Sequence, residues 1–205
     1  MINTKLLAEI CEESGAPGHE QKIRNIVLRE VKSLVDEVRI DNMGNVVAIK
    51  KGQKRKKVMI AAHMDEIGFI VTHIDDNGFI YFHTLGGFDP KTLTAQRVII
   101  HGKKDVVGVM GSKPIHLMNV ADRAKVPTIK DYFIDTGRSK KDLDKLISIG
   151  DTITRERKMI EMGDCLNCKS LDNRVSVFIL IEMFREMKKK PPYDVYGVFT
   201  VQEEI

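Results

Sequence analysis

Apolar residues near the N-terminus recur with the period of an amphipathic helix. In residues 4–14 these are Leu6, Leu7, Ile10 and Cys11, and Gly15 follows as a stop signal. A second helix is predicted after Pro17 and Gly18. Its apolar face consists of Ile23, Ile26, Val27, Val31 and Leu34. Both segments therefore predict helices that bury one side.

The next segments predict β-strands. Residues 37–41 and 46–50 flank a turn at 42–45 (NMGN), which predicts a strand pair. After a basic turn, residues 58–62 (VMIAA) form a short continuous apolar run. Such a run is typical of a strand that is buried on both faces, as in a helix-covered α/β sheet.

From about residue 67 to residue 151 the pattern changes to short β segments with almost no helical period. The predicted strands are 67–74, 79–83, 96–101, 105–110 and 146–149. The sequence DDNG at 75–78 is a strong hairpin signal between the first two. These segments predict a small, barrel-like β domain. Residues 116–130 lack periodicity and predict a mobile loop.

The α/β pattern returns at Ser170. Residues 175–187 (VSVFILIEMFREM) are apolar over most of a helical circumference, which predicts a helix buried against a sheet. Prolines follow it, and residues 195–201 predict another core strand. The predicted fold class is therefore α/β. A helix-covered mixed sheet, formed by residues 1–66 and 164–205, is interrupted by a barrel-like β insert over residues 67–163.

Charge and hydropathy exclude several classes of protein. The net charge is +4, and no apolar run approaches the roughly 20 residues that a membrane span needs. Basic residues cluster at 50–57 and 188–190. These clusters could form a nucleic-acid surface, or they could be a solvated turn and a helix C-terminus, where positive charge is favourable. No aromatic residues interleave them as a stacking platform would require, so we expect no nucleic-acid or membrane partner.

The three cysteines are Cys11, Cys165 and Cys168. An odd number argues against a disulfide scaffold and for a reducing cytoplasm. Cys165 and Cys168 form a CxxC pair that could be half of a zinc knuckle or a redox pair. The sequence offers no second CxxC or HxxxH to complete a tetrahedral site.

Residues that could bind metal or take part in catalysis lie where the predicted core strands end and the buried helix begins. His63 and Asp65 follow one core strand, Asp172 precedes the buried helix, and Glu203 and Glu204 follow the next core strand. Ligands of open α/β sheets collect at the carboxyl ends of the strands, so one sheet edge could hold all of them. Separately, each has an ordinary structural explanation, such as a helix N-cap for Asp172.

Together the residue types fit a hydrolytic site for divalent metal. Neutral imidazole and carboxylates are suitable ligands for zinc, cobalt or manganese. A carboxylate that bridges two metals holds them about 3.5–4 Å apart. Asp65 is placed to accept the second ring N–H of His63, and a free carboxylate could take a proton from water.

Several longer motifs make the sequence recognisable. They are SGAPGHE (14–20), DNMGNV (41–46), AAHMDEIGFIV (61–71), GSKPIH (111–116), SLDNRVSV (170–177) and VFTVQEEI (198–205). With these motifs the chain resembles the dinuclear-metal glutamyl aminopeptidases, also known as deblocking or tetrahedral aminopeptidases. The resemblance covers essentially the whole chain.

The resemblance implies a role for each candidate residue. His63 is expected to bind one metal ion, Glu204 the other, and Asp172 to bridge them. Glu203 is expected to act as the general base, and Asp65 to orient His63. The implied reaction removes N-terminal residues from short peptides. The family also implies a β insert within the peptidase domain and homo-oligomers, commonly dodecamers built from dimers.

The sequence departs from the family pattern after Glu204. The family uses a further Asp and a C-terminal His, and neither is found after Glu204 in this sequence. We therefore expect the chain as given to be incomplete and inactive by itself. Two other functions stay open: a non-catalytic assembly module, in which the β insert drives oligomerisation, and a glycoside hydrolase. The second would need two acids facing each other, whereas Glu203 and Glu204 are adjacent.

Overall fold

The computed structural model describes residues 2–205. It divides into two compact units, which are described separately. Unit 1 contains the residues up to Glu66 together with Lys158–Ile205, and unit 2 is Ile67–Arg157. The first is a helix-covered mixed sheet and the second is a closed barrel, so the predicted fold class is confirmed.

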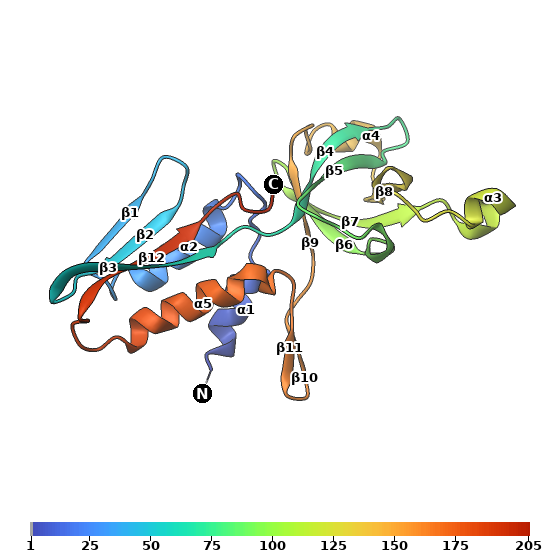
Figure 1. Cartoon of the computed structure of the whole chain (residues 1–205). Helices are drawn as coiled ribbons and strands as arrows, with labels where there is room; N and C mark the ends of the chain where they lie inside the picture. Colours follow the sequence, from blue (N-terminus) through green and yellow to red (C-terminus); the bar gives the residue numbers. More distant parts are fainter. Residues whose placement is uncertain (1) are drawn as a thin grey trace. The chain divides into compact units, whose positions relative to one another are not determined.

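The described residues of unit 1 form three α-helices, a sheet of four strands and a two-stranded hairpin (Figure 1). Its elements are α1 (Thr4–Glu12), α2 (Gln21–Val31), β1 (Glu37–Ile40), β2 (Val46–Lys50), β3 (Lys54–His63), β10 (Ile160–Met162), β11 (Cys165–Asn167), α5 (Leu171–Glu186) and β12 (Tyr193–Thr200).

The sheet of unit 1 is mixed, with the strand order β1-β2-β12-β3. β12 pairs antiparallel with β2 and parallel with β3. In the parallel pair, Thr200 stands opposite His63, so both strands end side by side. This register brings the segments that follow β3 and β12 to one edge of the sheet, as the sequence predicted for its candidate residues.

Helices α1, α2 and α5 share one apolar core with the sheet. Their buried residues include Leu6, Ile10, Ile23, Val27, Val177, Ile181 and Phe184, which meet Val46, Val195 and Phe199 from the strands. The predicted apolar faces of the first two helices are thus confirmed. Gly197 of β12 lies beneath Phe184, whose ring occupies the space that a Cβ would need.

The apolar run in β3 is not buried on both faces, so that prediction was wrong. Val58, Met59 and Ile60 are 41%, 71% and 40% exposed. Among the described strands β3 lies at the edge of the sheet, with β12 as its only neighbour. The helical core reaches its C-terminal end, where Ala62 and His63 are buried.

The hairpin of β10 and β11 belongs to unit 1, whereas the sequence assigned residues 158–163 to the β insert. The two residues just before β10 contact the end of α1. Lys158 Nζ lies 2.7 Å from Glu12 Oε2, and the Met159 backbone N–H donates to Glu12 Oε1 at 2.9 Å. These contacts join residues far apart in the sequence, so local composition did not reveal them.

Unit 2 is a closed barrel with the strand order β4-β5-β8-β7-β6-β9. Its elements are β4 (Gly68–Ile74), β5 (Ile80–Leu85), η1 (Pro90–Thr92), β6 (Arg97–His101), β7 (Asp105–Ser112), η2 (Ile115–Leu117), α3 (Val120–Arg123), η3 (Ile129–Asp131), β8 (Tyr132–Asp135), α4 (Lys140–Leu143) and β9 (Thr152–Arg155). Alternate residues of its strands fill the interior, as β7 shows with Val106 and Met110 buried and Val107 and Val109 exposed.

Two local predictions for unit 2 need correction. Residues 146–149 form a turn after α4 and not a strand, because Leu146 and Ile147 N–H groups bond back to Leu143. Residues 116–130, predicted to be a loop, contain short helical turns around α3. No helix among residues 2–205 is long and apolar enough to cross a membrane.

Candidate metal centre

His63 is the last residue of β3. The neighbouring residue is held by the sheet, because the Met64 backbone N–H donates to the Thr200 carbonyl at 2.7 Å. The imidazole is 7% exposed, with its Nε2 atom directed at Asp172. The sheet therefore presents one ring nitrogen of His63 at the edge where β3 and β12 end.

Asp172 reaches the same place from the start of α5. Ser170, two residues earlier, has a left-handed backbone (φ 61°), which turns the chain sharply before the helix. Asp172 and Asn173 have non-helical backbone angles, and the peptide bond between them is cis. Asp172 Oδ1 lies 3.3 Å from His63 Nε2, while 88% of the Asp172 side chain stays exposed.

Glu203 and Glu204 approach from the end of β12. The strand stops at Thr200, and Gln202 has a left-handed backbone (φ 56°). Because the regular alternation has ended, adjacent residues are no longer required to face opposite sides. Glu203 Oε2 lies 3.8 Å from His63 Nε2, and Glu204 joins His63 and Asp172 in one cluster.

Asp65 lies beneath this cluster and is fully buried. Its Oδ2 atom accepts the Glu204 backbone N–H at 2.8 Å. His63 Nδ1 lies 3.2 Å from the Asp65 carbonyl oxygen and 3.5 Å from Asp65 Oδ1. Asp65 Oδ1 has no hydrogen bond of ordinary geometry within the described chain, and the His63 ring lies alongside it.

The pKa values follow from these contacts. The neighbouring Asp65 carboxylate raises the pKa of His63 to about 9, with Glu203 and Asp172 adding to the effect and burial opposing it. Burial alone would raise the pKa of Asp65, but hydrogen bonds from His63 and from the Glu204 and Glu203 backbone lower it overall. Asp65 is therefore a carboxylate at neutral pH, ready to hold the His63 ring.

The donor set suits a divalent cation. His63, Asp172 and Glu204 each offer one ligand atom, and these atoms lie within 4.8 Å of one another. Burial raises the pKa of Glu204, and the nearby carboxylates of Glu203, Asp172 and Asp65 add to this, although His63 opposes it. A cation would relieve that crowding of negative charge, and imidazole with carboxylates is a zinc, cobalt or manganese donor set.

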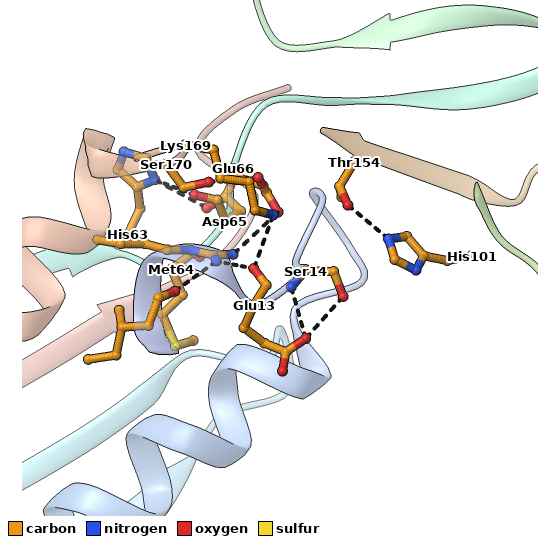
Figure 2. A network of polar contacts seen from close by, with 12 residues as sticks. Glu13, Ser14, His63, Met64, Asp65, Glu66, His101, Thr154, Lys169 and Ser170 are labelled. Carbon is orange, nitrogen blue, oxygen red and sulfur yellow. Dashed lines mark hydrogen bonds and ion pairs between the residues drawn. The ribbon is translucent and has the colours of Figure 1, made fainter. Parts of the chain in front are cut away.

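A second group of polar residues beside the centre was not predicted. Glu66, Lys169, Ser170 and Arg174 are all buried. Figure 2 shows Glu66, Lys169 and Ser170 in the network that also contains His63 and Asp65. The signal in the sequence is Arg174, a cation in the first turn of an apolar helix, where the helix dipole disfavours positive charge.

Comparison with known proteins identifies the family. The family model described as M42 glutamyl aminopeptidase matches residues 44–205, which is more than half of the chain. The chain belongs to this family. The resemblance seen in the sequence motifs is thereby confirmed.

Relatives and solved structures agree with this membership. The lysyl aminopeptidase of Pyrococcus furiosus is 34% identical over all of this chain and 60% of its own length. A TET aminopeptidase of a marine-sediment Thaumarchaeota archaeon is 33% identical, with a TM-score of 0.94 over 98% of this chain and 58% of that one. The Pyrococcus horikoshii TET1 peptidase, described as assembling into a tetrahedron or a large octahedral shell, is 30% identical, with a TM-score of 0.88 over 98% and 62%.

The chain is shorter than these proteins. It spans 56%, 58% and 60% of the length of three curated relatives that it matches.

Proposed function

We propose that the whole protein is a metal-dependent aminopeptidase that removes N-terminal residues from short peptides. The observation that carries this proposal is the cluster of His63, Asp172 and Glu204, whose ligand atoms lie within 4.8 Å of one another. Family membership supports the reaction class, and a lysyl aminopeptidase among the relatives supports a peptide substrate.

In this proposal the centre holds two divalent ions, either zinc, cobalt or manganese. His63 would hold one ion and Glu204 the other, and Asp172 would be shared between them. Ions bound in this way would polarise the scissile carbonyl and lower the pKa of the attacking water. The Asp172 side chain is 88% exposed, which supports the bridging role because its carboxylate has room to contact two ions.

The other residues handle protons and geometry. Glu203 lies beside His63 Nε2 and is largely exposed, so its carboxylate is free to take a proton from the attacking water at Oε2. It would then deliver that proton to the leaving amine. Asp65 holds the His63 ring from below, which keeps Nε2 directed toward the ligand cluster.

We further propose a cytoplasmic homo-oligomer, a dodecamer built from dimers. Three free cysteines support a reducing compartment. The assembly described for the TET1 peptidase supports the oligomer. Unit 2 offers exposed apolar side chains for contacts between copies, among them Val107, Val109, Ile115, Leu117 and Val120. An enclosed assembly would restrict substrates to short peptides.

The two alternative functions have less support. A non-catalytic assembly module would not require a histidine, two carboxylate ligands and a further carboxylate to lie together at one edge of the sheet. A glycoside hydrolase would require two carboxylates acting across a sugar, yet Glu203 and Glu204 both approach the same imidazole-carboxylate cluster.

Chelation tests the proposed function. The whole protein is dialysed against a chelator and then given cobalt, zinc or manganese, with the para-nitroanilides of leucine, lysine and glutamate as substrates. We expect activity to disappear and then return with metal, and His63→Ala to remain inactive. His83→Asn, which alters an exposed histidine in unit 2, is the control and should behave as the parent. Full activity in excess chelator would contradict the proposal, as would hydrolysis of a glycoside with no hydrolysis of the para-nitroanilides.

A further inference from the structure

Glu66 is a fully buried carboxylate whose two oxygens are both occupied. Its Oε1 atom lies 2.7 Å from Lys169 Nζ, and its Oε2 atom accepts the Ser170 hydroxyl at 2.6 Å. The side chains of Glu66 and Lys169 are 0% and 3% exposed. Figure 2 shows these three residues together, next to His63 and Asp65. The ion pair is thus shielded from water and charge-assisted.

This contact joins the two segments that carry the candidate ligands. Glu66 directly follows Asp65 and stands three positions after His63, while Ser170 stands two positions before Asp172. The strand pairing of β3 and β12 fixes His63 relative to the glutamates, but it does not include the start of α5. Through its side chain, Glu66 therefore links the loop that follows His63 to the turn that precedes Asp172.

Arg174 provides a second link between the loop after β3 and the start of α5. From the first turn of α5, its Nε donates to the Met64 carbonyl at 2.8 Å. Its Nη1 donates to the Ile10 carbonyl at 2.9 Å and also to the Glu13 carbonyl. Its Nη2 lies 3.9 Å from Glu66 Oε1. The loop after β3 is thereby held on the α5 side through both its backbone and its Glu66 side chain.

The backbone conformation at Ser170 explains why these side-chain contacts are needed. A left-handed backbone is unfavourable for serine, and Ser170 adopts it with φ 61°. The hydrogen bond from its hydroxyl to the buried carboxylate holds it in that conformation, and the turn sets the direction in which Asp172 leaves. A buried ion pair is weak evidence for stability alone, because a well-packed apolar set is often equally stable. Its better-supported effect here is to fix geometry.

We propose that Glu66, through Lys169 and Ser170, is a positioning residue that sets the separation of His63 and Asp172 for cation binding. This inference rests on the proposed function, because it assumes that the centre binds a metal. Glu66 itself does not point a free oxygen at the ligand cluster, so it acts only through the residues that it holds.

Cobalt binding tests the proposal. The whole protein, freed of metal, is titrated with Co²⁺ by calorimetry and by visible absorption, which reports the ligand geometry of the bound ion. We expect Glu66→Gln to weaken cobalt affinity by about 10- to 100-fold, the usual scale for residues that orient ligands, and to shift the absorption bands. Glu9→Gln is the matched control, because it removes a carboxylate from an exposed ion pair with Arg29 in the same unit.

A double variant separates positioning from stability. Glu66→Gln leaves Lys169 without its carboxylate partner, whereas Glu66→Gln with Lys169→Met removes both charges and should recover thermal stability. We expect cobalt affinity and spectrum to stay altered in the double variant. Recovery of both together with stability would overturn the positioning role. Ser170→Ala, which keeps the ion pair, should also shift the bands, and it serves if Glu66→Gln does not fold.

The outcomes distinguish this inference from the proposed function. If the unmodified whole protein binds cobalt and all Glu66 and Ser170 variants match it in affinity and spectrum, the inference is wrong and the metal site stands. If the unmodified whole protein binds neither cobalt, zinc nor manganese, the proposed metal site is overturned and the inference with it.

Discussion

The backbone N–H of Glu204 donates a hydrogen bond to Oδ2 of Asp65 at 2.8 Å, although 139 positions separate the two residues in the chain. The same carboxylate lies beneath the His63 ring. One buried side chain thus holds a candidate ligand from β3 and the backbone of a candidate ligand after β12. Any change at Asp65 should therefore affect His63 and Glu204 together.

Asp65→Asn is expected to weaken metal binding while leaving the fold intact. The amide can still accept the Glu204 N–H, but it no longer provides a negative charge for the His63 ring. Loss of such an orienting carboxylate usually costs about 10- to 100-fold in metal affinity. Competition titration with a chromophoric chelator measures the affinity. Asp144→Asn, which removes an exposed carboxylate from unit 2, is the control. Equal affinities in both variants would refute the orienting role.

Glu203→Gln is expected to retain metal and lose rate. The amide keeps the size of the side chain but has no basicity, and a positioned general base typically contributes about 10²- to 10⁴-fold. Steady-state hydrolysis of para-nitroanilides by the whole protein measures the rate, and metal analysis measures occupancy. Loss of metal at an unchanged rate per bound ion would make Glu203 a ligand instead.

Gly197→Ala is expected to destabilise unit 1. A Cβ at this position would overlap the Phe184 ring and lie 3.3 Å from Leu180 Cδ1, both in α5. Overpacking of this kind usually costs about 1–3 kcal/mol. Urea denaturation followed by circular dichroism gives the free energy of unfolding. Gly87→Ala is the matched control, because nothing lies within 4 Å of a Cβ built there. A stability equal to that of the control would show that α5 moves away freely.

The sequence predicted the parts of this protein that depend on local periodicity. The helical stripes of α1 and α2 and the hairpin at 75–78 follow from the order of residues alone, and Asp75 Oδ1 accepts the N–H groups of Asn77 and Phe79 in that turn. The edge position of β3 could not be predicted in this way. Strand order is set by long-range pairing, so a continuous apolar run did not reveal how many neighbours the strand has.

The sequence placed the candidate residues at strand and helix ends and predicted that one sheet edge could hold them. Parallel pairing aligns the ends of β3 and β12 and so brings His63 and Asp65 beside Glu203 and Glu204, whereas Asp172 comes from the start of α5. The Glu66–Lys169 ion pair was missed, because two charged residues separated by a whole domain carry no local pattern. Likewise, the left-handed turns at Ser170 and Gln202 are not signalled by glycine, the residue that usually marks them.

The cysteines should differ widely in reactivity. Cys11 is buried, Cys168 is partly buried and Cys165 is exposed. Burial raises the pKa of Cys11 to about 12, with the neighbouring Cys168 adding to this and Arg174 and Lys169 opposing it. Because the thiolate is the nucleophile, Cys11 should stay unmodified in the folded chain at pH 8. Peptide mass spectrometry after iodoacetamide treatment should show Cys165 labelled first and Cys11 only after unfolding.

The same shift gives stability a pH dependence of known sign. The ordinary pKa of this thiol is 9.0, so between pH 9 and about pH 12 the unfolded chain releases a proton that the folded chain keeps. The folded state then binds more protons, and the free energy of unfolding should fall as pH rises through this window. Cys11→Ala removes the group, so urea denaturation at pH 8 and pH 10 should show a smaller loss in this variant than in the parent. Cys165→Ser, which changes an exposed thiol, should lose as much as the parent. An equal loss in Cys11→Ala and Cys165→Ser would mean that Cys11 is not protected by the fold.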